Sequence, residues 1–239
     1  MSFPSVLITR PTPEAEDFAA SVASLGYGTL LDPLLAAQYF SVAESSLPQA
    51  VVATSAHAFA TPALTEWARL PVFVMGENSK ASARAAGYQN ILSANGDFAV
   101  LLKLIQATLV PGGQILYLRG ETVRHDLQAQ LPLFAIREEI VYAMRPARQL
   151  RETTVAALRT GAPLTVTLFS PQTAKVFAQL VDGHGLIDAL QRTNVLCLSD
   201  AVLESVNNLP WQRSGVAGQP DRQGMLAVLQ TWMDEIKDE

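Results

Sequence analysis

Short apolar segments and longer amphipathic segments alternate along the whole chain, and the same order of segments occurs twice. Apolar runs such as 6–9 are typical of buried parallel strands, and segments such as 13–25 have helical spacing. The first copy predicts strands near 6–9, 30–35, 51–54, 72–75 and 91, and helices over 13–25, from 55 to about 67, up to Gly87 and over 97–109. The second copy predicts strands near 115–118, 136–142, 166–169, 195–198 and 216, with helices after Gly120, Ser170 and Asp200 and over 221–236. Alternation of this kind favours an α/β fold.

Matching residues stand at the ends of corresponding strands in the two copies. The matched pairs and their separations are Arg10 and Arg119 at 109 residues, Ser55 and Ser170 at 115, and Gly76 and Ser199 at 123. The separation grows in one direction, as expected if loops lengthened in the second copy. The pattern therefore predicts a duplicated chain with two similar lobes, each a mostly parallel sheet flanked by helices.

The composition argues against several classes of function. The formal net charge is −5, and no stripe of lysine and arginine with interleaved aromatic residues suggests binding to nucleic acid. No apolar run reaches the roughly 18 to 20 residues of a membrane-spanning helix, and we expect no signal peptide because the first residues lack a basic region. The single cysteine, Cys197, lies in an apolar segment, which predicts a core residue in a protein of the reducing cytoplasm.

The sequence also lacks the motifs of common cofactors and metals. Neither of the glycine-rich loops that bind dinucleotides or nucleoside triphosphates occurs. The three histidines, His57, His125 and His184, have no histidine or cysteine neighbour at ligand spacing. No G-x-S-x-G motif supports a serine hydrolase, although the sequence alone leaves a catalytic triad open. We therefore expect no cofactor and no metal.

Small, hydroxylated or basic residues follow most of the predicted strands. In parallel sheets, ligands gather outside the carboxyl ends of the strands, and the N-terminus of a following helix attracts anions. The turns of this character are 9–10, 54–55, 76–79, 119–120, 170–173 and 199–200. At any single turn, a plain helix cap is the simpler explanation. Together, the six turns suggest a cleft that binds a polyanionic ligand.

Motifs along nearly the whole chain resemble one enzyme family. In sequence order they are Val6-Leu7-Ile8-Thr9-Arg10-Pro11, Leu25-Gly26-Tyr27, Asp32-Pro33-Leu34, Thr54-Ser55-Ala56-His57-Ala58, Val74-Met75-Gly76-Glu77-Asn78-Ser79-Lys80-Ala81, Leu116-Tyr117-Leu118-Arg119-Gly120 with Arg124, Val141-Tyr142, Phe169-Ser170-Pro171 and Gln219-Pro220-Asp221. In order and spacing, these motifs are similar to those of uroporphyrinogen-III synthase, the cofactor-free enzyme that closes and rearranges a linear tetrapyrrole.

The resemblance implies a bilobal fold in which the two copies exchange parts of the chain. One lobe would comprise residues 1–36 and 148–239, and the other would comprise residues 43–139. Two strands, 37–42 and 140–147, would join the lobes as a short antiparallel ladder. The sequence is consistent with this arrangement, because both stretches extend beyond an ordinary strand length.

The reaction that the resemblance implies begins with hydroxymethylbilane, a tetrapyrrole that carries eight carboxylates. Loss of its terminal hydroxyl gives an electrophilic azafulvene, and closure through a spiro intermediate inverts ring D to give uroporphyrinogen III, the precursor of heme, siroheme and cobalamin. Direct closure without the enzyme gives the unrearranged isomer I. The enzyme would be a lyase that eliminates water through positioning, charge placement and a proton donor for the departing hydroxyl.

The resemblance also assigns candidate site residues. Tyr142 matches the linker tyrosine of the family, whose hydroxyl would protonate or hydrogen-bond the leaving group; a tyrosine packed on the ladder is the alternative. Candidates for binding the substrate carboxylates are Ser55, Ser79, Gly120, Ser170 and Ser199, and the basic residues Arg10, Lys80, Arg119 and Arg124. Helix capping is the alternative for the serines, and surface ion pairs are the alternative for the basic residues.

The second copy departs from the family at one turn. Relatives often have Gly-x-Thr-Thr-Ala there, whereas this chain has Ser199-Asp200-Ala201-Val202-Leu203, so only Ser199 remains for binding. A non-enzymatic bilobal protein that binds an anionic metabolite is the competing hypothesis, and a different enzyme on a doubly wound fold is a second. The relatives are usually monomers, and a contact with the upstream enzyme that makes the bilane stays open.

Overall fold

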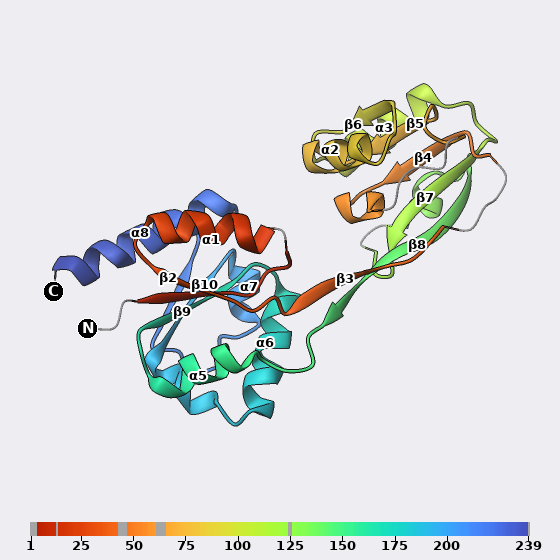
Figure 1. The fold of residues 1–239 in the computed structure, drawn as a ribbon. Coiled ribbons are helices and arrows are strands. Elements are labelled where there is room, and N and C mark those ends of the chain that lie inside the picture. The colour runs from red at the N-terminus through yellow and green to blue at the C-terminus, as the bar shows by residue number, and fades with distance from the viewer. Residues whose placement is uncertain (1–3, 13, 43–46, 61–65, 124–125, 239) are drawn as a thin grey trace. The chain divides into compact units, whose positions relative to one another are not determined.

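The computed structural model describes residues 4–12, 14–42, 47–60, 66–123 and 126–238, which form two compact units (Figure 1). Unit 1 comprises Met1–Ala36 and Arg145–Glu239, and unit 2 comprises Ala37–Met144. Each unit is built around one β-sheet. None of the described helices combines the length and the apolar character needed to cross a lipid bilayer.

Unit 1 has a five-stranded parallel sheet in the order β11-β10-β9-β1-β2. The strands are β1 (Ser5–Ile8), β2 (Gly28–Leu31), β9 (Leu164–Leu168), β10 (Thr193–Cys197) and β11 (Arg213–Val216). The helices are α1 (Glu14–Ser24), α5 (Glu152–Thr160), α6 (Pro171–Gly183), the 3-10 helix η2 (Ile187–Arg192), α7 (Asp200–Glu204) and α8 (Arg222–Asp238). The central strand β9 is buried along its whole length, including the two threonines that alternate with its apolar residues.

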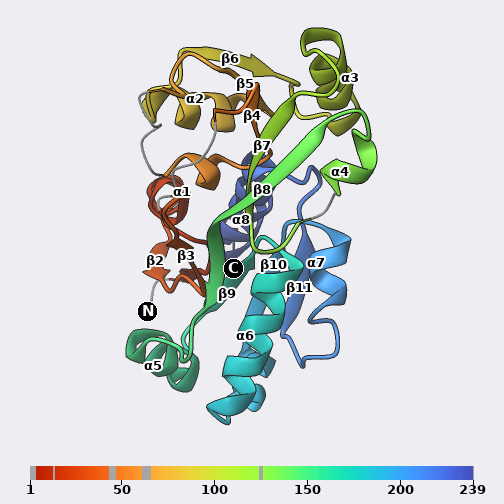
Figure 2. The ribbon, with the colours of Figure 1, turned by 90° about the vertical axis from the view of Figure 1, so that its right-hand side faces the viewer.

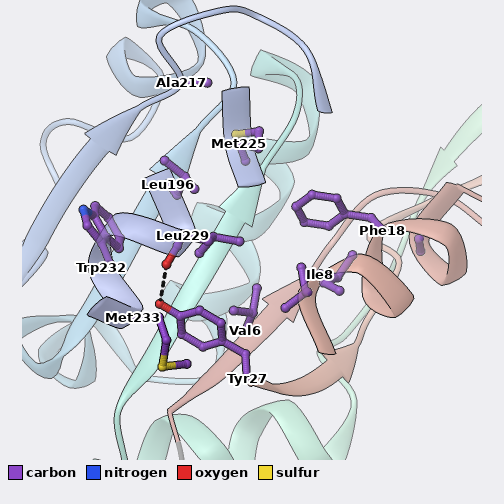
Figure 3. Close-up of a cluster of buried hydrophobic side chains, with 12 residues drawn as sticks. Val6, Ile8, Phe18, Tyr27, Leu196, Ala217, Met225, Leu229, Trp232 and Met233 are labelled. Atoms are coloured by element: carbon purple, nitrogen blue, oxygen red, sulfur yellow. Dashed lines mark hydrogen bonds between the residues drawn. The ribbon is translucent and has the colours of Figure 1, made fainter. Parts of the chain in front are cut away.

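One face of the unit 1 sheet is covered by α1 and α8, which enclose a hydrophobic core (Figure 3). Val6 and Ile8 of β1 belong to this core, and Phe18 reaches it from α1. Tyr27 completes the cluster, because its ring is buried and its hydroxyl donates to the Leu229 carbonyl at 2.9 Å. This bond satisfies a phenol that would otherwise lose its hydrogen bond to water. Away from this core, α6 and α7 pack next to each other (Figure 2).

Unit 2 has a six-stranded sheet in the order β3-β8-β7-β4-β5-β6. The strands are β3 (Leu35–Tyr39), β4 (Ala50–Ala53), β5 (Pro71–Val74), β6 (Asn90–Ser93), β7 (Gln114–Gly120) and β8 (Ala135–Pro146). The helices are the 3-10 turn η1 (Ala56–Phe59), α2 (Glu77–Ala85), α3 (Phe98–Thr108) and α4 (Leu127–Gln130). The strands from β8 to β6 are parallel. β3 runs antiparallel to β8, since Phe40 N–H donates to the Val141 carbonyl and Ala147 N–H donates to the Leu34 carbonyl.

The two sheets share one topology, which confirms the α/β fold with two similar halves. Unit 1 has the order β2-β1-β9-β10-β11, and five strands of unit 2 repeat it as β8-β7-β4-β5-β6, with β3 added beside β8. The strands β1 and β2 therefore correspond to β7 and β8, and β9 to β11 correspond to β4 to β6. The unit 1 sheet takes two strands from the first copy of the repeat and three from the second copy. The unit 2 sheet takes two strands from the second copy and four, including β3, from the first copy.

Three element assignments from the sequence are wrong. The expected strand over 30–35 is two strands, because Asp32 and Pro33 separate β2 from β3. In place of a helix from 55 to about 67, the described residues form only the short turn η1, and 61–65 lie outside the described residues. Gly120 ends a strand instead of opening a helix, because β7 continues beside β8, and the next described helix begins at Leu127.

The buried thiol of Cys197 gives a first prediction. Cys197 ends β10 with no exposed surface, and burial raises the pKa of its thiol to about 12. We expect no reaction with a thiol reagent at pH 8 in the native protein and full reaction in urea, because the thiolate is the reactive form. Rapid labelling of the native protein would contradict this expectation.

The same burial has a consequence for alkaline stability. The unfolded chain loses the Cys197 proton near pH 9, whereas the folded chain keeps it until about pH 12. Burial likewise raises the pKa values of Tyr27 and Tyr88 to about 12 from 10. The folded state therefore binds more protons in this range, so the free energy of unfolding should fall as the pH rises from 9 to 12. Urea titrations at several pH values measure this slope.

Candidate active site

A pocket of about 370 Å³ opens at the carboxyl ends of the central strands of unit 2. Its lining comes from the ends of β4, β5 and β7, from the first turn of α3 and from β8: Thr54, Ser55, Met75, Phe98, Tyr117, Gly120, Thr122, Val123 and Tyr142. The strands β4 and β7 are neighbours, and the strands that follow each of them in sequence lie on opposite sides of this pair. Doubly wound sheets bind ligands at such a switch in strand order.

Tyr142 reaches the pocket through an irregularity in the pairing of β7 with β8. Arg119 pairs with Ile140, but the next residue, Gly120, pairs with Tyr142. Val141 is therefore an extra residue, and β8 has a β-bulge at this point. As a result, Val141 and Tyr142 both pack against the same hydrophobic cluster. In a regular strand, successive side chains would point to opposite faces of the sheet.

Gly120 leaves room for the ring of Tyr142. A Cβ atom at residue 120 would stand 2.7 Å from Tyr142 Cζ and 2.9 Å from the phenol oxygen. Contacts this short are repulsive, so any larger residue at 120 would displace the phenol. Gly120 therefore contributes to the pocket by the absence of a side chain.

A second phenol, that of Tyr117 in β7, lines the same pocket. Its hydroxyl oxygen lies 3.3 Å from the hydroxyl oxygen of Thr54, and either group can donate. Burial raises the pKa of Tyr117 above its ordinary value, and the hydrogen bond with Thr54 opposes this rise. Tyr117 is therefore protonated at neutral pH and can donate a hydrogen bond.

His57 lies against Tyr142 and is held by two further residues. Ser55 is the N-cap of η1, and its Oγ accepts a hydrogen bond from His57 N–H at 3.3 Å. The Nδ1 atom of His57 lies 3.0 Å from the Tyr39 hydroxyl of β3. The rings of His57 and Tyr142 have centroids 5.3 Å apart and are inclined by 39°. Residues from β3, η1 and β8 thus meet around the Tyr142 ring.

The predicted serines lie in the first turns of helices that follow strands. Ser55 and Ser170 cap η1 and α6 with their side chains, and Ser170 Oγ accepts from Thr173 N–H at 3.1 Å. Ser199 is the N-cap residue of α7 but makes no capping bond with its side chain, so its hydroxyl is available to a ligand. Ser79 is buried in the first turn of α2. Of these four serines, Ser55 lines the unit 2 pocket.

Two of the predicted basic residues are already paired with acids. Lys80 Nζ lies 3.1 Å from Glu77 on the solvent side of α2. Arg119 Nε lies 2.6 Å from a Glu138 carboxylate oxygen, and Arg119 Nη1 donates to two backbone carbonyls. Arg124 lies outside the described residues. For Lys80 and Arg119, the structure contains the ion pairs that were the alternative to substrate binding.

Arg10 has a different environment at the end of β1 in unit 1. Its guanidinium carbon lies 4.5 Å from the centre of the Phe169 ring. Its Nε is buried and has no hydrogen-bond partner among the described residues. Burial lowers the pKa of Arg10, and the Glu14 carboxylate acts in the opposite direction. Because a guanidinium stays charged at physiological pH, Arg10 is a partly buried cation with a free donor.

The polar side chains that line the unit 2 pocket are all hydroxyl groups. They belong to Thr54, Ser55, Tyr117, Thr122 and Tyr142. Within the described parts of the chain, no group of three or more histidine, cysteine or acidic residues lies close enough to hold a metal ion. The arrangement therefore offers hydrogen bonds and proton donation to a ligand with oxygen-containing groups.

Three residues of this region, Thr54, Tyr117 and His57, are missing from the sequence-based candidates. All three stand in the motifs that resemble the family, and the hydroxyl of Tyr117 is the one polar side-chain group within the apolar run 115–118. Their relation to Tyr142 depends on which strands are neighbours and on where the bulge falls. Neither fact follows from local sequence patterns.

Comparison with known proteins identifies one enzyme family. A family model described as uroporphyrinogen-III synthase HemD matches residues 16–227. The crystal structure of uroporphyrinogen-III synthetase from Helicobacter pylori has 15% identity and a TM-score of 0.63, covering 97% of this chain and 100% of that chain. A mutant uroporphyrinogen III synthase from the extremely thermophilic bacterium Thermus thermophilus has 15% identity and a TM-score of 0.51, covering 100% of both chains. No curated protein sequence gives a significant match.

Proposed function

Because the chain belongs to the uroporphyrinogen-III synthase family, we propose that the unit 2 pocket holds the reacting end of hydroxymethylbilane and that Tyr142 is the proton donor. The protein is an enzyme that cyclises this linear tetrapyrrole to uroporphyrinogen III with inversion of ring D. One observation carries the proposal for the site. The bulge in β8 brings the Tyr142 phenol beside Gly120, into a pocket where other hydroxyl groups converge.

The first chemical step breaks the bond between the terminal carbon of the bilane and its hydroxyl oxygen. The leaving oxygen takes a proton from the phenol and departs as water. The electron pair of the adjacent pyrrole nitrogen forms the new double bond of the azafulvene. The nitrogen-bound proton is released to solvent, and solvent reprotonates the phenolate of Tyr142. Tyr117 and Thr54 offer further hydroxyl groups at the same pocket. A phenol is a weak acid at neutral pH, so hydrogen bonding and positioning complement proton transfer.

The substrate carboxylates would bind at turns that begin helices and at Arg10. A serine that accepts a bond from its own helix keeps its O–H proton for a carboxylate, so capping and binding are compatible at Ser55. Ser170 Oγ also lies 2.9 Å from the Thr173 hydroxyl, so these two hydroxyl groups would bind a carboxylate as a pair. Ser199 has a hydroxyl without a capping bond, and Arg10 has a buried Nε without a partner in the described residues. Of the other candidate side chains that the structure describes, Ser79 is buried, and Lys80 and Arg119 are already in ion pairs.

Conversion of hydroxymethylbilane tests the proposed function. The products are oxidised to porphyrins after incubation with the protein, and isomers I and III are separated by chromatography. We expect isomer III to form well above the background without protein. Isomer I alone, at the spontaneous rate, would overturn the proposed function and favour the non-enzymatic binding protein.

Tyr142→Phe tests the proton donor. We expect kcat for isomer III to fall about ten- to a hundredfold, because general acids contribute at the transition state, while KM changes little. The substitution keeps the ring against its hydrophobic cluster, so the fold should remain intact. The matched control is Tyr27→Phe, which removes a buried hydroxyl in unit 1 and should leave kcat unchanged. Wild-type kcat in Tyr142→Phe would remove Tyr142 from the mechanism.

We also propose that the enzyme works as a monomer in the cytoplasm. Resemblance to a family of monomers supports the first part, and a buried free cysteine supports a reducing compartment. A contact with the upstream bilane-producing enzyme would shorten the time that the reactive bilane spends in solution. Analytical ultracentrifugation of the protein, alone and mixed with that enzyme, measures both associations.

A further inference from the structure

We infer that His57 is a positioning residue that holds the phenol of Tyr142 in its reactive orientation. The inference rests on the proposed role of Tyr142 as the proton donor. It concerns the contact between the two rings, whose centroids lie 5.3 Å apart. His57 is absent from the pocket lining, so its effect on the substrate would be exerted through Tyr142.

The Tyr142 ring is confined on more than one side. The backbone at Gly120 lies so close that an added Cβ would stand 2.7 Å from Tyr142 Cζ. The His57 imidazole lies against the ring at an inclination of 39°. Without the imidazole, the tyrosine could rotate about its side-chain bonds away from Gly120 and leave the pocket. The His57 side chain and the Gly120 backbone thus both limit the movement of the Tyr142 ring.

His57 is itself held at two points, one on its backbone and one on its imidazole ring. Its backbone N–H donates to Ser55 Oγ at 3.3 Å, which sets the start of η1. Its Nδ1 lies 3.0 Å from the hydroxyl of Tyr39, which comes from β3. The Tyr39 hydroxyl donates to Nδ1 when the imidazole proton is on Nε2 and accepts when the proton is on Nδ1, and either bond fixes the orientation of the ring. A ring held in this way is a rigid wall for Tyr142.

A rigid wall matters because the phenol has to be in place when the bond to the leaving oxygen breaks. A mobile tyrosine spends only part of its time in the reactive rotamer, and the rate falls with that fraction. Binding of the rest of the substrate is unaffected, since its carboxylates contact other residues. Loss of the wall should therefore lower kcat and leave KM unchanged.

Two variants of His57 separate the contact from other effects. In His57→Ala the wall is removed, and we expect kcat to fall about tenfold with KM unchanged. His57→Phe keeps a ring against Tyr142 without the imidazole nitrogens, and we expect kcat within about threefold of wild type. In the Tyr142→Phe background, His57→Ala should have no further effect on kcat. An equal loss in both backgrounds would show that His57 acts independently of Tyr142 and would overturn the inference.

A spectroscopic measurement tests the position of Tyr142 without substrate. The chain has five tyrosines, so labelling with 3-fluorotyrosine gives few fluorine resonances, which single Tyr→Phe variants assign. We expect His57→Ala to shift and broaden the Tyr142 resonance and to leave that of Tyr27 in unit 1 unchanged. An unchanged Tyr142 resonance would overturn the inference even if Tyr142 is the proton donor. A shifted resonance together with wild-type kcat in Tyr142→Phe would instead support the contact and overturn the proposed role of Tyr142.

Discussion

Gly120→Ala should lower kcat for isomer III about a hundredfold and leave the protein folded. Gly120 has no left-handed backbone conformation, so alanine fits the main chain of β7. The added Cβ would stand 2.7 Å from Tyr142 Cζ, and the atoms in its way belong to the end of a side chain that can rotate. The phenol is therefore displaced from the position where it meets the leaving group, and displacements of about 1 Å cost on the order of a hundredfold in rate.

Gly113→Ala is the matched control for this substitution. Gly113 lies just before the first residue of β7, whereas Gly120 is the last residue of this strand. A Cβ added at Gly113 would press on the Gln49 side chain and not on Tyr142. We expect its kcat to equal that of the wild type. In the Tyr142→Phe background, Gly120→Ala should add little to the loss, because the hydroxyl is already absent. A Gly120→Ala enzyme with wild-type kcat would show that the close approach of Gly120 to the Tyr142 ring has no part in the reaction.

Phe18→Ala should lower the free energy of unfolding of unit 1 by about 3 to 5 kcal/mol. Phe18 has no exposed surface and lies in the core between α1, β1 and α8 (Figure 3). Its ring also meets the ring of Phe169 edge-on, with centroids 5.0 Å apart, and Phe169 in turn lies beneath the Arg10 guanidinium. Truncation leaves a cavity that the two flanking helices cannot fill without moving. Urea unfolding followed by circular dichroism measures the change.

Ile236→Ala provides the comparison for Phe18→Ala. Ile236 is on α8 in the same unit, but 46% of its surface is exposed. We expect its effect to stay within about 0.5 kcal/mol. A loss below about 1 kcal/mol in Phe18→Ala would mean that the core of unit 1 adjusts around the missing ring and that Phe18 does not anchor α1.

The strands and long helices were predictable because their signals are local. Buried runs such as those of β1 and β9 have the composition of parallel strands, and Asp97 and Ser170 mark helix starts by their capping side chains. Errors arose where a neighbouring strand decides the outcome. The pairing of β7 with β8 extends the strand through Gly120, although Arg119-Gly120 looks locally like the turn before a helix.

The active-site geometry was only partly predictable for the same reason. Tyr142, Ser55 and Gly120 were expected from the family resemblance, and the three residues line one pocket. Their convergence depends on the pairing of β4 with β7 and on one extra residue in β8. The contact between His57 and Tyr142 joins positions that are 85 residues apart in the sequence. Periodicity cannot reveal pairings at such separations.

The exchange of strands between the two sheets has a consequence for how the protein emerges from the ribosome. Unit 2 is one continuous stretch, Ala37–Met144, and its sheet is complete before the rest of unit 1 exists. β1 and β2 end at Leu31, but the outermost strand of their sheet ends at Val216, 185 residues later. At roughly 5 to 20 residues per second, these two strands wait about 10 to 40 s for their sheet to be completed, and until β9 appears each has only the other as a partner. The segment of β1 and β2 is thus synthesised before unit 2 but completes its sheet after unit 2, and it needs protection from aggregation during that interval.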